Sequence, residues 1–211
     1  MIDATDDGSS LEYSDAHALV SHEYLLPKVC AIIDGLAAGK PTRIFDVGAG
    51  NGSVANELCR GGHQVTGVDP SATGVAQANK AYPAIRIELG SAYDDLAQRY
   101  GRFPVVLSLE VIEHLLYPRR LARTAFDLLE PGGTLILSTP YHGYLKNVAL
   151  ALSGRMDAHF TALWDGGHVK FWSFRTLRAL LLEAGFVSVR FHRVGRVPPL
   201  AKSMIAVAGR P

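Results

Sequence analysis

The sequence is poor in cysteine, in net charge and in long apolar runs, and each shortage excludes a class of protein. Its 211 residues include only two cysteines, neither in a metal-binding or redox spacing, which predicts reduced thiols in a cytoplasmic protein. The 21 basic and 20 acidic residues nearly cancel, so the chain lacks the charge excess of a general nucleic-acid binder. No apolar run approaches the roughly 20 residues of a membrane span, and the acidic, polar residues 1–14 are unlike a secretory signal.

What the chain does contain is an alternation of strand-like and helix-like segments, in a length suited to one domain. Short apolar runs without alternating polar residues favour parallel strands that are covered on both faces. Pro131-Gly132-Gly133 predicts a helix stop and a turn just before the fifth strand. We expect strands at about 43–47, 64–69, 85–89, 103–109 and 133–138, with helices near 52–60, 72–81 and 118–129.

The two ends of the chain depart from this alternation. A frayed start is followed by helical periodicity over 16–36, with an interruption around Pro27. Residues 141–167 carry no strand pattern but include an apolar helix-like piece at 145–152. This stretch is long for a connection, which predicts a mobile lid over a binding site. The chain then ends in a helix over 173–185 and two strands near 187–193 and 202–207.

The first expected strand ends in an acidic residue and a loop with glycine at every second position. The segment reads Ile44-Phe45-Asp46-Val47-Gly48-Ala49-Gly50-Asn51-Gly52. Glycine tolerates positive φ and has no Cβ, so the chain can turn sharply there and a ligand can approach the backbone closely. The helix expected next would point free N–H groups and the positive end of its dipole at that ligand. This pattern is typical of a cofactor site.

The second expected strand also ends in an acid, Asp69, which follows Gly52 by 69 − 52 = 17 residues. A carboxylate at a strand end can accept hydrogen bonds from both hydroxyls of a ribose. Asp and Ser are also favoured at helix starts, so the run Asp69-Pro70-Ser71 has a second interpretation as the cap of the following helix. The two interpretations are compatible. Together with the glycine loop, Asp69 predicts a cofactor that contains a nucleoside.

The order acidic-x-Gly-x-Gly-x-Gly, led by Asp46, resembles the first motif of class I S-adenosylmethionine (SAM) methyltransferases. A dinucleotide-binding loop of the G-x-G-x-x-G type instead needs glycine at the position of Ser53. The resemblance implies a Rossmann-like α/β fold, with helices on both faces of a seven-stranded, mostly parallel sheet in the order 3-2-1-4-5-7-6. It also implies an N-terminal helical segment, 1–40, and a methyltransferase domain, 41–211, with the lid at 141–167.

The same resemblance implies which residues bind SAM at the carboxyl ends of the first strands. Many relatives have Asp at the position of Ser91, so here the backbone of Ala92 is the safer expected contact. The expected cofactor-binding residues are Asp46, Gly48, Ala49, Gly50, Gly52, Asp69, Pro70, Ser91, Ala92 and Leu109.

A cluster of acids and a histidine follows the fourth expected strand, at the same edge of the sheet. Glu110, Glu113 and His114 have i, i+3, i+4 spacing, which would place them on one face of a helical turn. Two carboxylates so close repel one another, which favours a cation between them. The glycines before His168 would let this histidine approach the cluster. Two oxygen and two nitrogen donors suit a divalent ion such as Mg²⁺.

This set is similar to the metal ligands of two methyltransferase families, the ubiquinone-biosynthesis O-methyltransferases and the small-RNA 3′-terminal 2′-O-methyltransferases. The resemblance implies that Glu110, Glu113, His114 and His168 bind a divalent cation, which in turn binds adjacent substrate hydroxyls. Many class I methyltransferases have a similar stretch without a known metal, which leaves open a metal-free role for His114 as a pocket residue or base. His142, after the fifth strand, is either a surface histidine or a second base.

Together these motifs predict SAM-dependent methyl transfer to a hydroxyl oxygen of a small organic molecule. A divalent cation is a second cofactor to be tested. Two alternatives stay open: methylation of an RNA 2′-hydroxyl, and a non-catalytic or NAD(P)-binding Rossmann module. The balanced charge predicts no DNA partner and disfavours RNA. A membrane contact is expected only if the acceptor is a lipid, and the sequence makes no prediction of the oligomeric state.

Overall fold

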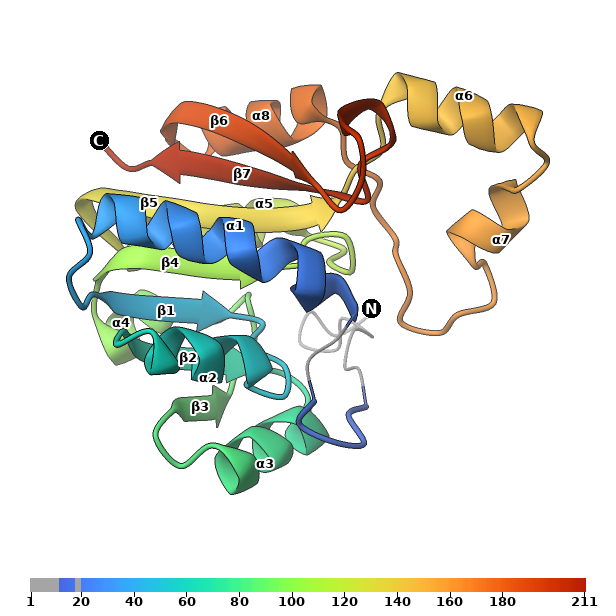
Figure 1. Cartoon of the computed structure of the whole chain (residues 1–211). Helices are drawn as coiled ribbons and strands as arrows, with labels where there is room; N and C mark the ends of the chain where they lie inside the picture. Colours follow the sequence, from blue (N-terminus) through green and yellow to red (C-terminus); the bar gives the residue numbers. More distant parts are fainter. Residues whose placement is uncertain (1–11, 18–19) are drawn as a thin grey trace, which may run out of the picture.

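The computed structural model describes residues 12–17 and 20–211. Its centre is a seven-stranded sheet in the order β3-β2-β1-β4-β5-β7-β6, in which β7 runs antiparallel to both of its neighbours (Figure 1). This order confirms the predicted class I fold. The strands are β1 (Arg43–Val47), β2 (Gln64–Asp69), β3 (Arg86–Leu89), β4 (Phe103–Leu109), β5 (Leu129–Pro140), β6 (Val187–Val194) and β7 (Ser203–Gly209).

Helices cover both faces of the sheet (Figure 1). In β1, Ile44 packs toward one set of helices, whereas Phe45 and Val47 pack toward the other set. Because both faces are buried, each strand needs apolar residues at successive positions, which explains the continuous apolar runs of the sequence. The first set is α1 (Val20–Leu36), α2 (Ser53–Arg60) and α3 (Ala72–Ala81), and the second is α4 (Leu96–Tyr100), α5 (Pro118–Leu128) and α8 (Phe174–Glu183).

Helix α1 runs without a break through Pro27, so the predicted interruption is wrong. Proline removes one helical hydrogen bond and crowds the preceding turn. Three fully buried residues, Leu25, Val29 and Ile33, hold the helix on the sheet on both sides of the proline and offset that cost. The helix packs into the same core as the first strands, while a separate N-terminal segment stays a prediction.

Strand β5 is longer than predicted, because it begins directly after α5 and runs through the expected turn. Leu129 pairs with Phe103, and Thr134 pairs with Val105. Between these two pairs the chain advances by five positions along β5 but by only two along β4. The extra residues bulge at the turn, where Gly132 has φ +78°. The local pattern therefore identified the turn but not the pairing on either side of it.

The segment 141–167 contains two helices, α6 (Tyr144–Leu152) and α7 (Met156–Phe160), which lie beyond the carboxyl ends of β4 and β5 (Figure 1). The predicted helical piece is confirmed as α6, which packs against the 3₁₀ helix η1 (Pro198–Leu200) between β6 and β7. Neither α6 nor α7 has a buried residue, so the insert is loosely packed, and its mobility stays a prediction. No helix in the described ranges has the length and apolar character needed to cross a membrane.

Candidate active site

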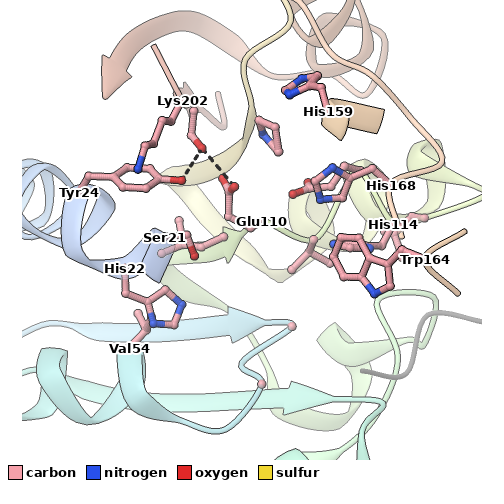
Figure 2. A pocket seen from close by; sticks show the side chains of 18 of the residues that line it. Ser21, His22, Tyr24, Val54, Glu110, His114, His159, Trp164, His168 and Lys202 are labelled. Atoms are coloured by element: carbon pink, nitrogen blue, oxygen red, sulfur yellow. Dashed lines mark hydrogen bonds between the residues drawn. The ribbon is translucent and has the colours of Figure 1, made fainter. Parts of the chain in front are cut away.

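A cavity of about 780 Å³ opens at the carboxyl edge of the sheet. Its walls come from the glycine loop after β1, the ends of β2 and β4, the start of α1, the insert 141–167 and the turn between β6 and β7. Ligand sites of α/β folds lie at this edge, and the volume is in the range of small-molecule pockets. Figure 2 shows the part of the cavity that lies between α1, β4 and the insert.

The glycine loop has a shape that other residues would strain. Gly50 has φ +55°, in the left-handed region that favours glycine, and a Cβ on it would lie 2.6 Å from the Tyr13 hydroxyl. The N–H groups of Gly48 and Ala49 both donate to Val68 O, at 2.9 and 3.0 Å, which fixes the loop on β2. Helix α2 begins directly after the loop, so the positive end of its dipole faces the cavity.

Asp69 lies at the end of β2, and backbone N–H groups engage both of its carboxylate oxygens. Oδ2 accepts from Gly50 N at 2.7 Å, and Oδ1 accepts from Ser71 N at 2.8 Å. The cap of α3 is Ser71, whose Oγ accepts from Gly74 N at 3.1 Å. Asp69 thus joins the glycine loop to the start of α3. A carboxylate oxygen accepts more than one hydrogen bond, so these contacts are compatible with a ribose ligand.

Asp46 is buried in β1, beside the same loop. Burial, followed by the nearby charge of Asp69, raises the pKa of Asp46 to about 7. Tyr13 lines the cavity from the segment 12–17, and burial followed by the charges of these two acids raises its pKa as well. Two acids therefore lie close together at the cofactor end of the cavity, where a cationic ligand group would be stabilised.

Hydrogen bonds hold the segment 12–17 against the glycine loop and the end of α3. The side chains of Asn51 and Tyr82 donate to backbone carbonyls of this segment at 2.6 to 3.1 Å. The described part of the N-terminal region is thus tied down, in contrast to the expected frayed start, and residues 1–11 lie outside the described part. Sequence reasoning missed Tyr13 as a cavity residue, because no local pattern connects it to the glycine loop.

Most of the predicted cofactor residues line the cavity. Gly52 and Ser91 do not, because Gly52 faces α3, where a Cβ on it would lie 2.8 Å from Ala78 Cβ. The Ser91 hydroxyl accepts from Tyr93 N at 3.2 Å within its own loop, while Ala92 reaches the cavity. The lining residues from the predicted set are Asp46, Gly48, Ala49, Gly50, Asp69, Pro70, Ala92 and Leu109.

The predicted helical turn is present only in part, because Glu110 departs from it. After β4 the chain makes one turn, in which His114 N donates to the carbonyl three residues earlier at 3.0 Å, and Glu110 has the left-handed φ +55°. This backbone directs the Glu110 side chain toward β5 and β7. Its Oε1 accepts from Ser138 Oγ at 2.8 Å, and its Oε2 accepts from Ser203 Oγ at 3.1 Å. Helical spacing therefore failed to predict the direction of Glu110.

Glu113, His114 and His168 form a cluster whose ligating atoms lie within 4.8 Å of one another. Figure 2 shows the two histidines of this cluster side by side. His168 is held there because the N–H groups of the two residues after it donate to Glu113 O at 2.8 and 2.9 Å. His114 Nδ1 donates to Gly166 O at 2.8 Å, and since a carbonyl only accepts, the lone pair of the neutral ring lies on Nε2. The structure thus brings together three of the four predicted metal ligands, with Glu110 outside the group.

Burial disfavours charge on each member of the cluster. Glu113 is 1% exposed, and neither of its carboxylate oxygens has a hydrogen-bond partner among the described residues. Burial, followed by the charge of Glu110, raises the pKa of Glu113 well above its usual range. Burial lowers the pKa of His114, and it lowers that of His168 to about 4 with smaller effects from neighbouring histidines. An unpartnered buried carboxylate beside two neutral imidazoles fits a divalent cation.

His142, the second predicted base, lies at the start of the insert, is buried by the rest of it and does not line the cavity. Its ring lies 5.4 Å from the His159 ring and 5.0 Å from the Phe171 ring, measured between centroids. Its Nδ1 has no partner in the described part of the chain, and burial followed by the charge of Lys146 lowers its pKa to about 4. The surface interpretation is wrong, because the insert covers this residue, and the role as a base stays a prediction.

The start of α1 supplies cavity residues that sequence reasoning did not connect with the site. His22 Nδ1 lies 3.2 Å from Ser53 Oγ, and burial lowers the pKa of this histidine to about 4. Tyr24 OH lies 3.3 Å from Ser203 Oγ, which itself donates to Glu110 (Figure 2). Tyr24 and Ser203 are 179 residues apart in the sequence, so no periodic pattern could have predicted this contact.

Comparison with known proteins gives the family of the chain. A family model described as a methyltransferase domain matches residues 21–190. The ubiquinone biosynthesis O-methyltransferase of Azorhizobium caulinodans is 35% identical over 156 residues, which are 70% of this chain and 59% of that protein. Its counterpart in Caulobacter sp. (strain K31) is 36% identical over 126 residues, 58% of this chain and 48% of that protein. The chain thus spans about half the length of the curated relatives it matches.

Solved structures share the fold. The magnesium protoporphyrin IX methyltransferase from Synechocystis PCC 6803 with bound SAH has a TM-score of 0.66 and 23% identity, over 89% of this chain and 82% of that chain. An O-methyltransferase family protein from Burkholderia thailandensis has a TM-score of 0.67 and 17% identity, over 88% and 55% of the two chains. The family match favours SAM over the NAD(P)-binding alternative. The chain belongs to the methyltransferase domain family, and its fold and motifs are those of a class I SAM-dependent methyltransferase domain.

Proposed function

We propose that this protein transfers the methyl group of SAM to a hydroxyl oxygen of a small organic acceptor. The observation that carries the proposal is the cluster of Glu113, His114 and His168 in the same cavity as the glycine loop. A methyl donor bound at the loop and a hydroxyl held at the cluster would meet in one enclosed space. The similarity to O-methyltransferases over 70% of the chain supports oxygen as the accepting atom.

On the cofactor side, SAM would place its polar groups against the two strand acids. The Asp69 carboxylate offers acceptors to the ribose hydroxyls. Asp46 offers a partner to the cationic methionine part, whose positive charge would lower the raised pKa of this acid. The missing Cβ at Gly50 leaves room for the Tyr13 side chain, which covers the same end of the cavity.

For the reaction, the protein must align the acceptor oxygen with the methyl group of SAM and remove one proton from the acceptor hydroxyl. The sulfonium already activates the methyl group: the C–O bond forms as the C–S bond breaks, and the electron pair of that bond stays on sulfur. The acceptor hydroxyl must lose its proton. His114 is suited to take it, because Nδ1 is committed to Gly166 O, burial keeps the ring neutral and Nε2 carries the lone pair. Closure of the insert over the cavity would exclude competing water.

A divalent cation fits the same cluster. Glu113, His114 and His168 would hold it, because the buried carboxylate lacks a partner and both imidazoles are neutral. When bound, such an ion favours the deprotonated form of an acceptor hydroxyl. Glu110, engaged by two serine hydroxyls, would act on the cluster through its charge. Nε2 of His114 cannot hold an ion and take a proton at the same time, so the two roles exclude one another.

The proposal is tested by incubating the protein with SAM and three kinds of acceptor: catechols and phenols, primary amines, and short RNA with a free 3′ end. We expect S-adenosylhomocysteine (SAH) to form with the hydroxyl compounds, and mass spectrometry to locate the methyl group on oxygen. Transfer to the amines alone, or to the RNA alone, would contradict the proposal.

A chelator then separates the two roles of the cluster. Loss of turnover that Mg²⁺ restores identifies the cation, whereas unchanged turnover identifies His114 as a metal-free base. Metal binding and proton removal both need neutral histidines, so both roles predict a similar pH profile. The response to the chelator therefore distinguishes the two roles.

A further inference from the structure

The acceptor end of the cavity is lined by four cationic side chains from separate parts of the chain. Lys146 belongs to α6, Arg155 to the turn after α6, Arg196 to the turn after β6, and Lys202 directly precedes β7. None of the four forms an ion pair with a carboxylate of the described residues. Cations that converge on a cavity without counter-ions point to an anionic ligand.

Lys146 and Arg196 line the same part of the cavity, and the charge of Arg196 acts on Lys146. The pKa of Lys146 is lowered first by burial and then by the charge of Arg196, against a smaller opposing effect of Glu110. The Lys146 ammonium donates to a neutral group, Tyr141 O, at 2.9 Å. Lys146 is half-buried and Arg196 is exposed at the rim of the same cavity, and an anion held between the two would offset their repulsion.

Lys202 extends the cationic lining toward α1. Its Nζ lies 5.0 Å from the centre of the Tyr24 ring, a cation–π contact that holds the side chain beside the cavity (Figure 2). Arg155 is exposed and belongs to the insert. The positive charge is therefore supplied both by the insert and by the strand side of the cavity.

The acids of the cavity do not neutralise this end. Asp46 and Asp69 lie at the cofactor end, beside the glycine loop, and Glu113 belongs to the histidine cluster. Glu110 is engaged by two serine hydroxyls, and burial raises its pKa to about 7. The acceptor end thus has a local excess of positive charge in a chain whose formal net charge is only +1.

We propose that the methyl acceptor carries an anionic oxyacid group, a carboxylate or a phosphate ester, which binds between Lys146 and Arg196 with Arg155 and Lys202 beside it. The inference rests on the proposed function, since it assigns a second recognition group to the same acceptor. An arginine binds an oxyacid through two parallel hydrogen bonds, and a lysine adds a point charge. The site selects acid-bearing hydroxyl compounds, because a neutral analogue would leave the cations unpaired.

The test measures binding of matched small probes to the protein saturated with SAH, by ligand-observed NMR. The probes are 3,4-dihydroxybenzoate, its neutral amide 3,4-dihydroxybenzamide, and phenyl phosphate. The variant Lys146→Ala/Arg196→Ala is compared with Lys40→Ala/Arg175→Ala, which removes the same charge from two exposed positions outside the cavity lining. Arg196→Gln, which retains most of the side-chain volume, serves as a second variant.

We expect at least one acid to bind roughly 10-fold or more tightly than the amide, since hydrogen bonds to charged groups are stronger than those between neutral groups. The preference should weaken in Arg196→Gln, disappear in Lys146→Ala/Arg196→Ala and persist in the control pair. The benzoate and phosphate probes decide which oxyacid fits. Equal binding of acids and amide, no binding of either acid, or a preference that survives the double substitution would overturn the proposal.

Calorimetric titration with SAH on the same samples separates this proposal from the proposed function. A parent protein that fails to bind SAH contradicts the methyltransferase function itself. A variant that retains SAH affinity and loses the acid preference locates the effect at the acceptor end. We expect SAH affinity to change less than about 2-fold in both double variants, because neither removes a hydrogen bond of the cofactor end.

Discussion

The two ends of the cavity are built in opposite ways. At the cofactor end, Asp69 and the backbone satisfy one another through hydrogen bonds of 2.7 and 2.8 Å, on strands that are buried on both faces. At the acceptor end, Glu113 has no described partner, four cations lack described counter-ions, and the insert helices bury no residue. The cofactor end is therefore complete before a ligand arrives, whereas ligands complete the acceptor end.

The difference follows from how each end is attached to the core. Loops that leave buried strands are positioned by those strands, while an insert with few buried contacts opens at low free energy. Substitutions at the cofactor end should therefore change cofactor affinity, and substitutions at the acceptor end should change turnover. A variant that changes both quantities together would contradict this division.

The largest effect is expected from His114→Ala. Removal of a base or ligand should reduce turnover about 10²- to 10⁴-fold and leave SAH affinity unchanged, because His114 contacts the acceptor end only. Initial rates and calorimetric titration measure the two quantities. His192→Ala, on the edge strand β6, is the matched control and should retain both. A parallel loss of SAH affinity in His114→Ala would show that the two ends are not independent.

The next largest effect is expected at the cofactor end. Asp69→Ala should weaken SAH binding by about 2–4 kcal/mol, because it removes acceptors for two ribose hydroxyls and the contact with the glycine loop. Gly50→Val should weaken it further, since the residue has φ +55° and a Cβ would meet Tyr13. Calorimetric titration with SAH measures the affinity of each variant. Asp157→Ala, at an exposed position, is the control and should bind SAH like the parent. Unchanged affinity in both variants would mean that the cofactor site is elsewhere.

Asp46→Asn should stabilise the ligand-free protein at neutral and higher pH. The pKa of Asp46 rises from 3.8 to about 7 on folding, so between these values the folded protein binds a proton that the unfolded chain has lost. Stability from this group therefore falls as pH rises from about 4 to about 7. Such a shift corresponds to roughly 4 kcal/mol at most, and lost carboxylate contacts reduce the gain, so urea unfolding at pH 8 should show about 2 kcal/mol.

The same acid links stability to cofactor binding. The cationic sulfonium and ammonium groups of SAM should lower the raised pKa of Asp46, so SAM binding near pH 7 should release a proton in the parent and not in Asp46→Asn. Calorimetry in buffers of different ionisation enthalpy detects that proton. Asp165→Asn, at an exposed position, should behave like the parent. A stability difference between parent and Asp46→Asn that is constant from pH 4 to 8 would contradict the prediction.

The smallest effect is expected in the insert. Limited proteolysis should cut within residues 141–167, where neither α6 nor α7 has a buried residue, and cutting should slow several-fold only when SAH and an acceptor are both present. SAH alone should protect the cofactor end without protecting the insert. Equal cutting rates with and without both ligands would indicate that the insert is rigid. The acceptor end would then be preformed, as the cofactor end is.

Much of the sheet could be predicted because strand and helix patterns are local. Strands β1, β2 and β4 lie where the apolar runs predicted them. Two local predictions failed. The interruption expected at Pro27 is absent, because buried apolar residues on both sides hold α1 on the sheet. The strand expected to begin after the glycine turn begins before it, because β5 pairs with β4 on both sides of the turn. Propensity is a weak preference, and tertiary contacts overrode it at both places.

The sequence by itself determined the glycine-loop end of the cavity, where we propose that the cofactor binds. Glycines at fixed spacing and an acid at the end of each of two strands specify backbone shape and hydrogen-bonding groups within a short stretch of chain, so Gly50 and Asp69 could be placed without coordinates. Only the tertiary structure decided the acceptor end. A left-handed backbone turned Glu110 away from the cluster, and the docked insert brought His168 to Glu113. These outcomes depend on one backbone angle and on contacts between residues far apart in the chain, which no local pattern encodes.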